Sequence, residues 1–520
     1  MAACVPVFVG ALDLTVVSAV LPAVLLELKI PIQEGIADAS WTVSGYLAAY
    51  VFGMLIMAGA SDRLGRREAF LIALGIFSVG SLASAASADG FGQWIRGLER
   101  AVDLPVLDPS MPKIHALVAG RVLQGFGAGA LVPVAMAVAA DLFVEARAAA
   151  IGAVAAVDTA GWVLGHLYGG IVVQAFPWQA LFWANLPLAA VSAAVAWSAL
   201  RALPRGDPRS AFDRLGAVLL GLALAGITLA FGGNELSGPP ALARPVGAPG
   251  YALPAALVGI LALAAFVALE RRATGPLVDV RLLAERGTAA FALANVAVGF
   301  CAMVGLVSVP LLVNTIGARS SREGALASGE LLALLTIPLA LAAVPGGVLT
   351  IRAGPRPVAV VGLALAAAGF VQISRWDAGT VREAVDLVTL GAVPSGAIAP
   401  MIAGLVLAGV GLGLATAPLA VALIDRAPAA RRGSTSAFVI SLRLLGMSVS
   451  AGLLTSFGLR SLAVIAQGRL AELASPDPVR AIEASRGIAT QVSAEMAVIA
   501  AGAAVVGLVA AACGSNKDAR

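Results

Sequence analysis

Apolar segments long enough to cross a lipid bilayer recur along the whole chain, and they constrain its fold more than any other feature. Two of them, WTVSGYLAAYVFGMLIMA and AFLIALGIFSVGSLASAAS, begin at Trp41 and Ala69 and flank the charged stretch GASDRLGRRE (59–68). A helix of about 20 apolar residues spans the hydrocarbon core of a membrane. The chain is 60% hydrophobic and only 12% charged, whereas soluble domains carry roughly 25% charged residues. The sequence therefore predicts an all-α membrane protein.

Short polar or charged stretches separate the apolar segments, so that fourteen transmembrane helices are expected. The expected spans are 4–28, 41–60, 69–88, 116–141, 148–171, 179–200, 213–232, 251–269, 288–315, 325–350, 357–373, 400–424, 434–459 and 493–513. The first span has no basic flank and contains Asp13, so we interpret it as a transmembrane helix rather than a signal peptide. No polar tail precedes it, and we therefore expect an upstream start.

The distribution of Lys and Arg predicts the orientation of the chain. With an even number of spans, both termini lie on the same side of the membrane. If that side is the cytoplasm, the inner segments, together with Arg214 at the start of its span, hold 19 Lys and Arg in about 70 residues, against 13 in about 140 outer residues. This asymmetry follows the positive-inside rule. We therefore expect a multi-pass protein of the cell membrane with cytoplasmic N- and C-termini, and GASDRLGRRE as a cytoplasmic loop.

The sequence offers no recognisable machinery for catalysis or for metal binding. Its cysteines, Cys4, Cys301 and Cys513, lie in or beside apolar segments, and His115 and His166 are far apart. Walker A, HExxH and GxSxG patterns do not occur in the sequence. Lys and Arg form no run on a polar segment long enough to fold, which argues against a nucleic-acid partner. We expect a protein that is not an enzyme and that uses no metal or cofactor.

A faint internal repeat indicates two related halves. GVLTIRAGPR (347–356) has the outline of ASDRLGRR: Arg352 corresponds to Arg63 and Gly354 to Gly65, while Ile351 stands where the first loop has an aspartate. Two halves with matching cytoplasmic loops are a common plan among transporters.

The first of these loops resembles a signature of the major facilitator superfamily, G-x-L-x-D-R-x-G-R-R. The matching residues are Asp62, Arg63, Gly65, Arg66 and Arg67, with Ala58 at the first glycine position. The resemblance implies that the loop latches the two halves of a transporter on the inner side and releases when they rock. A carboxylate there can face a helix N-terminus and nearby arginines, and Gly65 permits a tight turn. The alternative is a purely topological role, in which the arginines hold the loop in the cytoplasm.

Further motifs are similar to those of the fourteen-helix drug:proton antiporter branch of this superfamily. LDLTVVSAVLP (12–22) resembles its first-helix motif, with Ser18 where Asn is usual, and AGRVLQGFGAGA (119–130) resembles its fourth-helix motif. GWVLGHLYGG (161–170) resembles the antiporter motif G-x-x-x-G-P-x-x-G-G, with His166 in place of Pro. Its residues of interest are Gly161, Gly165, His166, Gly169 and Gly170. We read the glycines as sites of close helix packing, and favour packing over titration for His166.

Within this branch the sequence is most similar to the mycobacterial triacylglyceride exporters, which work beside a lipid-carrying lipoprotein. This likeness rests on GALD (10–13), LYG (167–169), ISRW (373–376) and ARRGSTSAFVISLRLLGM (430–447), together with ASDRLGRR. It implies a six-helix bundle at 1–200, two linker helices and loops at 201–287, and a second six-helix bundle at 288–520. It also implies a monomer that is driven by the proton gradient without a cofactor, in which a periplasmic or surface lipoprotein is a candidate partner.

Charged residues inside the apolar spans are the candidate functional residues, because each is costly in a bilayer unless it is paired or hydrated. We single out Asp13, Arg121, Asp158 and Arg443. We hypothesise that Asp13 binds the transported proton and that Arg121 is its partner, since burial and a cation shift a carboxylate pKa in opposite directions. Asp158 and Arg443 belong to opposite halves and could form a second pair across the cavity. A structural ion pair is the competing interpretation of each.

The outer segments and the substrate leave alternatives open. VDLVTLGAVPSGAIAP (385–400) alternates as a β-hairpin does, although a plain loop fits equally, and 469–496 looks like an amphipathic helix broken at Ser-Pro-Asp-Pro.

Few charges face the expected cavity, which favours a proton-coupled exporter of hydrophobic or amphipathic compounds, in the narrow version a lipid. A multidrug:proton antiporter without a lipid role is the alternative. A non-transporting receptor or scaffold is a third, disfavoured by the buried charges.

Overall fold

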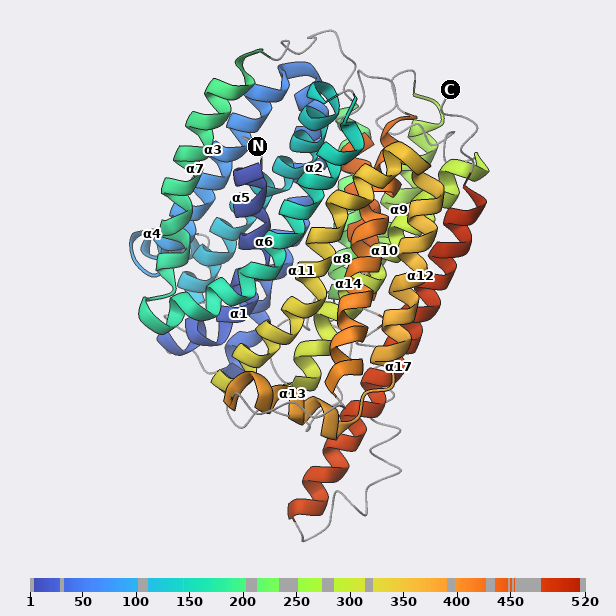
Figure 1. Ribbon diagram of the computed structural model, residues 1–520. Helices are drawn as coiled ribbons and strands as arrows, with labels where there is room; N and C mark the ends of the chain where they lie inside the picture. Colours follow the sequence, from blue (N-terminus) through green and yellow to red (C-terminus); the bar gives the residue numbers. More distant parts are fainter. Residues whose placement is uncertain are drawn as a thin grey trace. The chain divides into compact units, whose positions relative to one another are not determined.

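The computed structural model consists of α-helices joined by loops (Figure 1). It describes residues 4–28, 32–101, 111–143, 145–202, 213–232, 251–273, 285–313, 321–390, 398–426, 435–447, 449–450, 453 and 478–514, and these contain no β-strand. The chain divides into two compact units. Unit 1 comprises Met1–Gly238, Ala248–Glu285 and Leu423–Ser441, and unit 2 comprises Pro239–Gly247, Arg286–Ala422 and Leu442–Arg520.

Unit 1 is built around a long central helix, α5. Its elements are α1 (Cys4–Glu27), α2 (Ile32–Leu64), α3 (Arg66–Ala85), α4 (Gly90–Ala101), α5 (Met111–Leu142), α6 (Arg147–Ala175), α7 (Gln179–Ala199), the 3₁₀ turn η1 (Leu200–Ala202), α8 (Arg214–Gly232) and α9 (Ala252–Glu270). Helix α5 packs against α2 and α3, while α1 packs against α6 and α7 against α3. Helices α8 and α9, which the sequence predicts to be linkers, pack on each other, and α8 also contacts α2. Both belong to unit 1.

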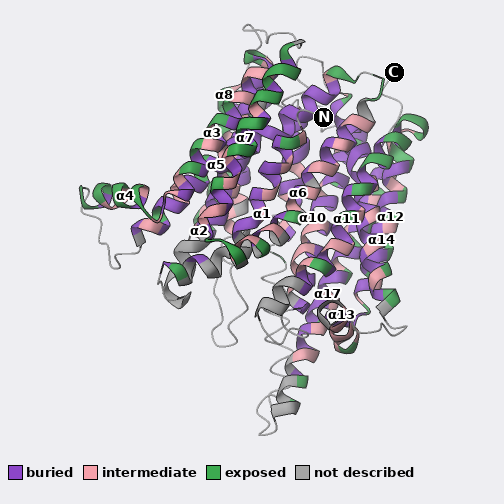
Figure 2. Cartoon of the chain, turned by 60° about the vertical axis from the view of Figure 1, so that its left-hand side comes forward, coloured by how far each residue is buried: buried purple, intermediate pink, exposed green. Residues whose placement is uncertain are grey.

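Unit 2 contains α10 (Arg286–Leu312), α11 (Ser321–Ala353), α12 (Pro355–Ile373), α13 (Ala378–Leu390), most of α14 (Ile398–Ile424) and α17 (Pro478–Cys513). The C-terminal helix α17 packs along α10 and α12. A further apolar helix, Thr435–Met447, begins in the part of the chain assigned to unit 1 and ends in unit 2. Figure 2 shows buried residues along the interior faces of these helices and exposed residues on their outer faces.

The expected spans all coincide with or overlap helices. Ten helices are long and apolar enough to cross a membrane, and four shorter apolar helices are found among the described residues. The four are Cys4–Val17, Ala149–Trp162, Arg214–Ile227 and Thr435–Met447. This number of apolar helices identifies a multi-pass membrane protein.

The structure corrects the expected hairpin and extends one expected helix. Residues 385–390 form the last turns of α13 rather than a strand, and 391–397 lie outside the described residues. Alternation over so short a run does not distinguish a strand from an amphipathic helix. Helix α17 starts at Pro478, the last residue of Ser-Pro-Asp-Pro, because proline is well accommodated in the first turn of a helix. The helix then continues without interruption into the last span.

The two loops of the internal repeat share an unusual backbone conformation. Gly65 has φ 106° between α2 and α3, and Gly354 has φ 82° between α11 and α12. Among the described residues these are the two glycines with positive φ. Side chains other than hydrogen are rarely tolerated there. The structure thus confirms that the repeat noticed in the sequence marks equivalent helix–helix turns.

Candidate functional site

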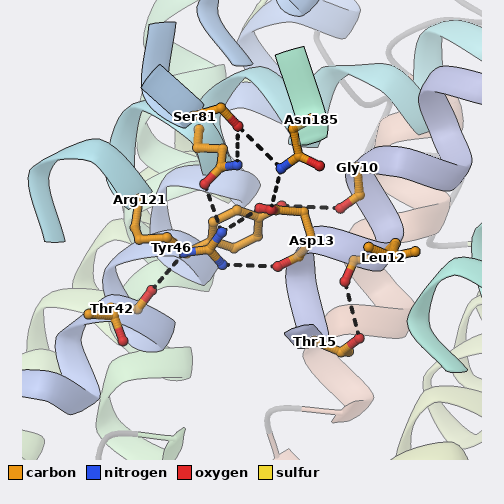
Figure 3. Close-up of polar contacts among 10 residues, drawn as sticks. Gly10, Leu12, Asp13, Thr15, Thr42, Tyr46, Ser81, Arg121 and Asn185 are labelled. Carbon is orange, nitrogen blue, oxygen red and sulfur yellow. Dashed lines mark hydrogen bonds and ion pairs between the residues drawn. The ribbon is translucent and has the colours of Figure 1, made fainter. Parts of the chain in front are cut away.

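Asp13 lies at the centre of a buried polar network that joins helices α1, α3, α5 and α7 of unit 1 (Figure 3). Its carboxylate forms an ion pair with Nη1 of Arg121 on α5 and accepts a hydrogen bond of 2.9 Å from Nδ2 of Asn185 on α7. Arg121 Nη2 also donates to the backbone oxygen of Asp13 at 3.1 Å. Asp13 is 1% exposed and Arg121 is fully buried. The structure therefore brings together the two residues that the sequence predicts to be partners.

Neutral polar side chains extend the network around this ion pair. Arg121 Nη1 donates to Oε1 of Gln124 at 2.8 Å, and Gln124 Nε2 donates to the hydroxyl of Ser81 on α3 at 2.6 Å. The same hydroxyl accepts a 3.2 Å bond from Asn185 Nδ2. Five charged or polar side chains thus connect α1, α3, α5 and α7. These hydrogen bonds satisfy the remaining polar atoms of the ion pair and offset the cost of removing its charges from water.

Helix α2 contributes an aromatic face and a backbone acceptor. The guanidinium of Arg121 lies 3.9 Å from the centroid of the Tyr46 ring, and its Nε donates to the backbone oxygen of Thr42 at 3.3 Å. The Tyr46 hydroxyl donates to the backbone oxygen of Gly10 on α1 at 3.2 Å. Arg121 is consequently held by contacts that do not depend on the Asp13 carboxylate.

An apolar cluster lies one helical turn away from the network. Val16 and Val17 follow Asp13 on α1, Leu117 precedes Arg121 on α5, and Phe182 precedes Asn185 on α7; all four are buried. This neighbourhood excludes water and strengthens the electrostatic interaction between the paired charges. A carboxylate in this setting can bind or release a proton only when the conformation changes or water enters.

Close packing between α1 and α6 fixes the position of the helix that carries Asp13. A Cβ at Gly165 would clash with Thr15 and with the backbone oxygen of Leu12, and one at Gly161 would lie 2.6 Å from the backbone oxygen of Phe8. The Thr15 hydroxyl also donates to the backbone oxygen of Trp162 at 2.7 Å. The predicted close approach is confirmed for these two glycines. Gly169 is buried, and the surroundings of His166 and Gly170 lie outside the described residues.

The other two predicted charged residues are also buried. Asp158 on α6 is 6% exposed and belongs to unit 1, and Arg443 on helix 435–447 is 9% exposed and belongs to unit 2. Within unit 2, α10 passes so close to Arg443 that a Cβ at Gly299 would clash with the Arg443 backbone oxygen. Because the two residues belong to different units, their expected pairing stays a prediction.

The charged loop between α2 and α3 forms a second cluster in unit 1. Arg66 forms an ion pair with Asp62, donates to the Ser61 hydroxyl at 2.6 Å, and reaches Asp141 on α5 at 3.4 Å. The Arg67 guanidinium lies 3.7 Å from the centroid of the Trp197 ring on α7, and Arg63 is exposed. The signature residues thus tie α3 to α2, α5 and α7 within this unit.

Sequence reasoning missed the roles of Asn185, Ser81 and Tyr46. Asn185 lies in the apolar segment PWQALFWANLP (177–187). A neutral amide in an apolar span is a signal of an interhelical hydrogen bond, and it could have singled out this residue. Among the described residues, no group of three or more His, Cys, Asp or Glu side chains could hold a metal ion.

Comparison with known proteins identifies the family. The sequence profile of the Major Facilitator Superfamily matches residues 4–451. A probable triacylglyceride transporter of Mycobacterium leprae is 32% identical over 487 residues, covering 93% of this chain and 88% of that protein. A triacylglyceride transporter of Mycobacterium tuberculosis is 33% identical over 455 residues, covering 87% and 81%.

Solved structures agree on the fold. A human organic anion transporter superposes with a TM-score of 0.54 at 15% identity, covering 97% of this chain and 98% of its own. A proton:xylose symporter gives 0.53 at 15% identity, covering 96% and 93%. The helical architecture, the matching profile and the similar relatives lead to one conclusion: this chain belongs to the major facilitator superfamily of membrane transporters.

Proposed function

We propose that this transporter exports hydrophobic or amphipathic lipids, triacylglycerides or similar molecules, in exchange for protons by alternating access. The observation that carries the proposal is the buried Asp13–Arg121 pair, a titratable group held inside an apolar bundle. The lipid substrate is supported by relatives named as triacylglyceride transporters, which cover most of this chain. A multidrug:proton antiporter is the alternative, since the antiporter-like motifs fit it equally.

The contacts of Arg121 support a proton cycle at Asp13. When Asp13 is ionised, its charge is balanced by Arg121 and solvated by Asn185. When a proton binds the carboxylate, Arg121 keeps Gln124 and the Thr42 backbone oxygen as acceptors. Both protonation states therefore leave the buried cation with partners, which lowers the cost of passing between them.

We also propose roles in this transport cycle for the other residues that the sequence predicts to be functional. We assign Asp62, Arg63, Gly65, Arg66 and Arg67 to a latch between the two halves. Asp158 and Arg443 are assigned to a second charge pair that is remade during transport. Normal transport by the Asp158→Asn variant would remove that second pair from the mechanism.

We further propose fourteen spans, made of the ten long helices and the four shorter apolar ones, with both termini in the cytoplasm. In this scheme the protein works as a monomer, needs no cofactor beyond the proton gradient, and delivers its substrate to a lipid-binding lipoprotein. Co-purification of such a lipoprotein with the transporter after crosslinking would test the partner.

Reconstitution in liposomes with an imposed pH gradient tests the function. A fluorescent triglyceride and ethidium are followed in parallel, with Asp13→Asn as the uncoupled variant. We expect gradient-driven movement of the triglyceride that falls to background in the variant. Movement of ethidium alone would instead make the protein a drug antiporter. Triglyceride movement without a gradient requirement would contradict proton coupling.

A further inference from the structure

Helix α4 presents an apolar stripe away from the rest of unit 1. Phe91, Trp94, Ile95 and Leu98 recur at the spacing of one helix face. Trp94 is 59% exposed and Leu98 is 46% exposed, and the rings of Phe91 and Trp94 stack with centroids 5.7 Å apart. Figure 2 shows α4 lying crosswise to the neighbouring helices and projecting from the side of the bundle, with most of its surface exposed. Large aromatic side chains in such a position call for an apolar environment.

A different face of α4 is fixed to α5. Glu99 is buried, and its Oε1 lies 2.6 Å from Nδ1 of His115 on α5. Gly92 is buried on the same side, where a Cβ would clash with the backbone oxygen of Ser87. These contacts set the rotation of α4 about its axis and leave the apolar stripe turned away from α5.

The depth of α4 follows from the length of the helix before it. Helix α3 has 20 residues, which is about 30 Å and matches the hydrocarbon thickness of a bilayer. It starts directly after the charged loop at Arg66, so its other end, Ala85, lies at the opposite membrane boundary. A compact turn then leads into α4, in which the Phe91 N–H donates to the Ala86 oxygen at 3.2 Å. Helix α4 therefore begins at the level where hydrocarbon meets head groups.

We propose that α4 is an interfacial helix that lies in the membrane surface at the end of unit 1 opposite the 59–68 loop. Phe91, Trp94 and Leu98 insert among the acyl chains of that leaflet. Arg96 and Arg100 lie away from the stripe, where they can reach phosphate head groups. Amphipathic helices with aromatic and basic residues divided in this way bind bilayer surfaces, and Trp favours this depth. The occupant of the stripe is thus the phospholipid bilayer itself.

Spin labels on two faces of α4 test the proposal in the full-length protein. The background replaces Cys4, Cys301 and Cys513, and a nitroxide is attached to Leu98→Cys or to the matched control Gln93→Cys. Gln93 is exposed on the same helix and lies on the face opposite the stripe. In vesicles of phosphatidylethanolamine and phosphatidylglycerol, collisions with oxygen report lipid and collisions with a nickel chelate report water. We expect a several-fold higher oxygen-to-nickel ratio at 98 than at 93.

Other outcomes would overturn the proposal. Frequent nickel collisions at both positions would place α4 in water. Infrequent collisions with both reagents at 98 would show that protein covers the stripe, a second copy of this chain being the obvious candidate. If the cysteine-free background does not fold, the natural chain is used with brominated lipids: their quenching of tryptophan fluorescence should decrease in Trp94→Phe. Unchanged quenching in that variant would also contradict insertion.

Discussion

At the scale of single residues, the candidate site is a buried ion pair in which each charge compensates the other. Neither Asp13 nor Arg121 is accessible to solvent, so removal of one charge leaves the other without compensation in a medium of low dielectric. The hydrogen bonds from Asn185 and to Gln124 reduce this cost without removing it. Stability and function at this site can therefore be separated by comparing single with double substitutions.

Asp13→Asn should destabilise the folded protein by about 3–5 kcal/mol, the usual effect of breaking a buried ion pair. The double variant Asp13→Asn/Arg121→Gln removes both charges and should recover much of this loss. Gradient-driven transport should be absent from both. Thermal unfolding in detergent and liposome transport measure the two effects. A double variant that transports normally would show that the pair is structural only.

Gly65 and Gly354 have backbone conformations that other residues rarely adopt. With φ 106° and ψ 149° at Gly65, Gly65→Ala should cost about 1–3 kcal/mol. Gly75→Ala is the matched control, since an added Cβ there meets nothing within 4 Å and the residue is helical. In thermal unfolding, Gly65→Ala should be less stable than Gly75→Ala. Equal stability would mean that the turn relaxes without cost.

Residue chemistry also explains what the sequence could and could not reveal about the site. Asp13 and Arg121 could be predicted as partners from the sequence, because a charge in an apolar span is costly unless it is paired. Asn185 could not be placed by this argument, since a neutral amide has many possible partners among neighbouring helices. Which helices lie side by side depends on packing, and the packing is visible only in the structure.

At the scale of elements, the α1–α6 contact positions the proton-binding candidate. Gly165→Ala would force a methyl group into Thr15 and the Leu12 backbone. Because backbone cannot move aside as a flexible side chain can, the helices must separate. We expect a loss of about 1–3 kcal/mol and reduced transport through displacement of Asp13. Gly502→Ala, where a Cβ meets nothing within 4 Å, should leave both quantities unchanged. Thermal unfolding and liposome transport of both variants measure these effects.

Helix α13 depends on a cap outside the membrane. The Thr380 N–H and hydroxyl donate to Asp377 Oδ1 at 2.8 and 3.0 Å, and these bonds lower the pKa of the Asp377 carboxyl from its ordinary value. Asp377→Ala should destabilise α13 by about 1 kcal/mol, measured as faster amide exchange in 378–390, with α12 as internal control. Since the folded-state pKa is the lower one, the cap contributes fully above pH 3.8 and is lost as the pH falls through the folded value.

Hydropathy located the membrane helices well because their apolar length follows directly from bilayer thickness. It failed for the segment at 385–400, where the alternation of VDLVTL fits either an amphipathic helix or a strand, and the residues up to Leu390 are helical. It also gave no indication of α4. A short amphipathic helix beside a bilayer has too few apolar residues to be distinguished from a loop by average hydropathy.

At the scale of the whole molecule, the orientation in the membrane rests on the Lys and Arg asymmetry alone. Twelve or fourteen spans would both return the C-terminus to the side of the N-terminus. An odd count, which would follow if one of the four shorter apolar helices failed to cross, would separate the termini. The side on which each end lies is therefore a test of the span count as well as of the orientation.

The cysteine near the C-terminus offers this test without a tag. Cys513 is exposed at the end of α17, whereas Cys301 is buried. A membrane-impermeant maleimide should label Cys513 in inverted vesicles but not in intact spheroplasts, because the positive-inside rule predicts that this end lies in the cytoplasm. Asp377→Cys, with Cys513 replaced, is the matched control: the proposed topology places it on the opposite side, so it should show the reverse pattern. Labelling of both sites from one side would contradict the proposed number of membrane crossings between them. A complete exchange of the two labelling patterns would show that the protein has the opposite orientation in the membrane.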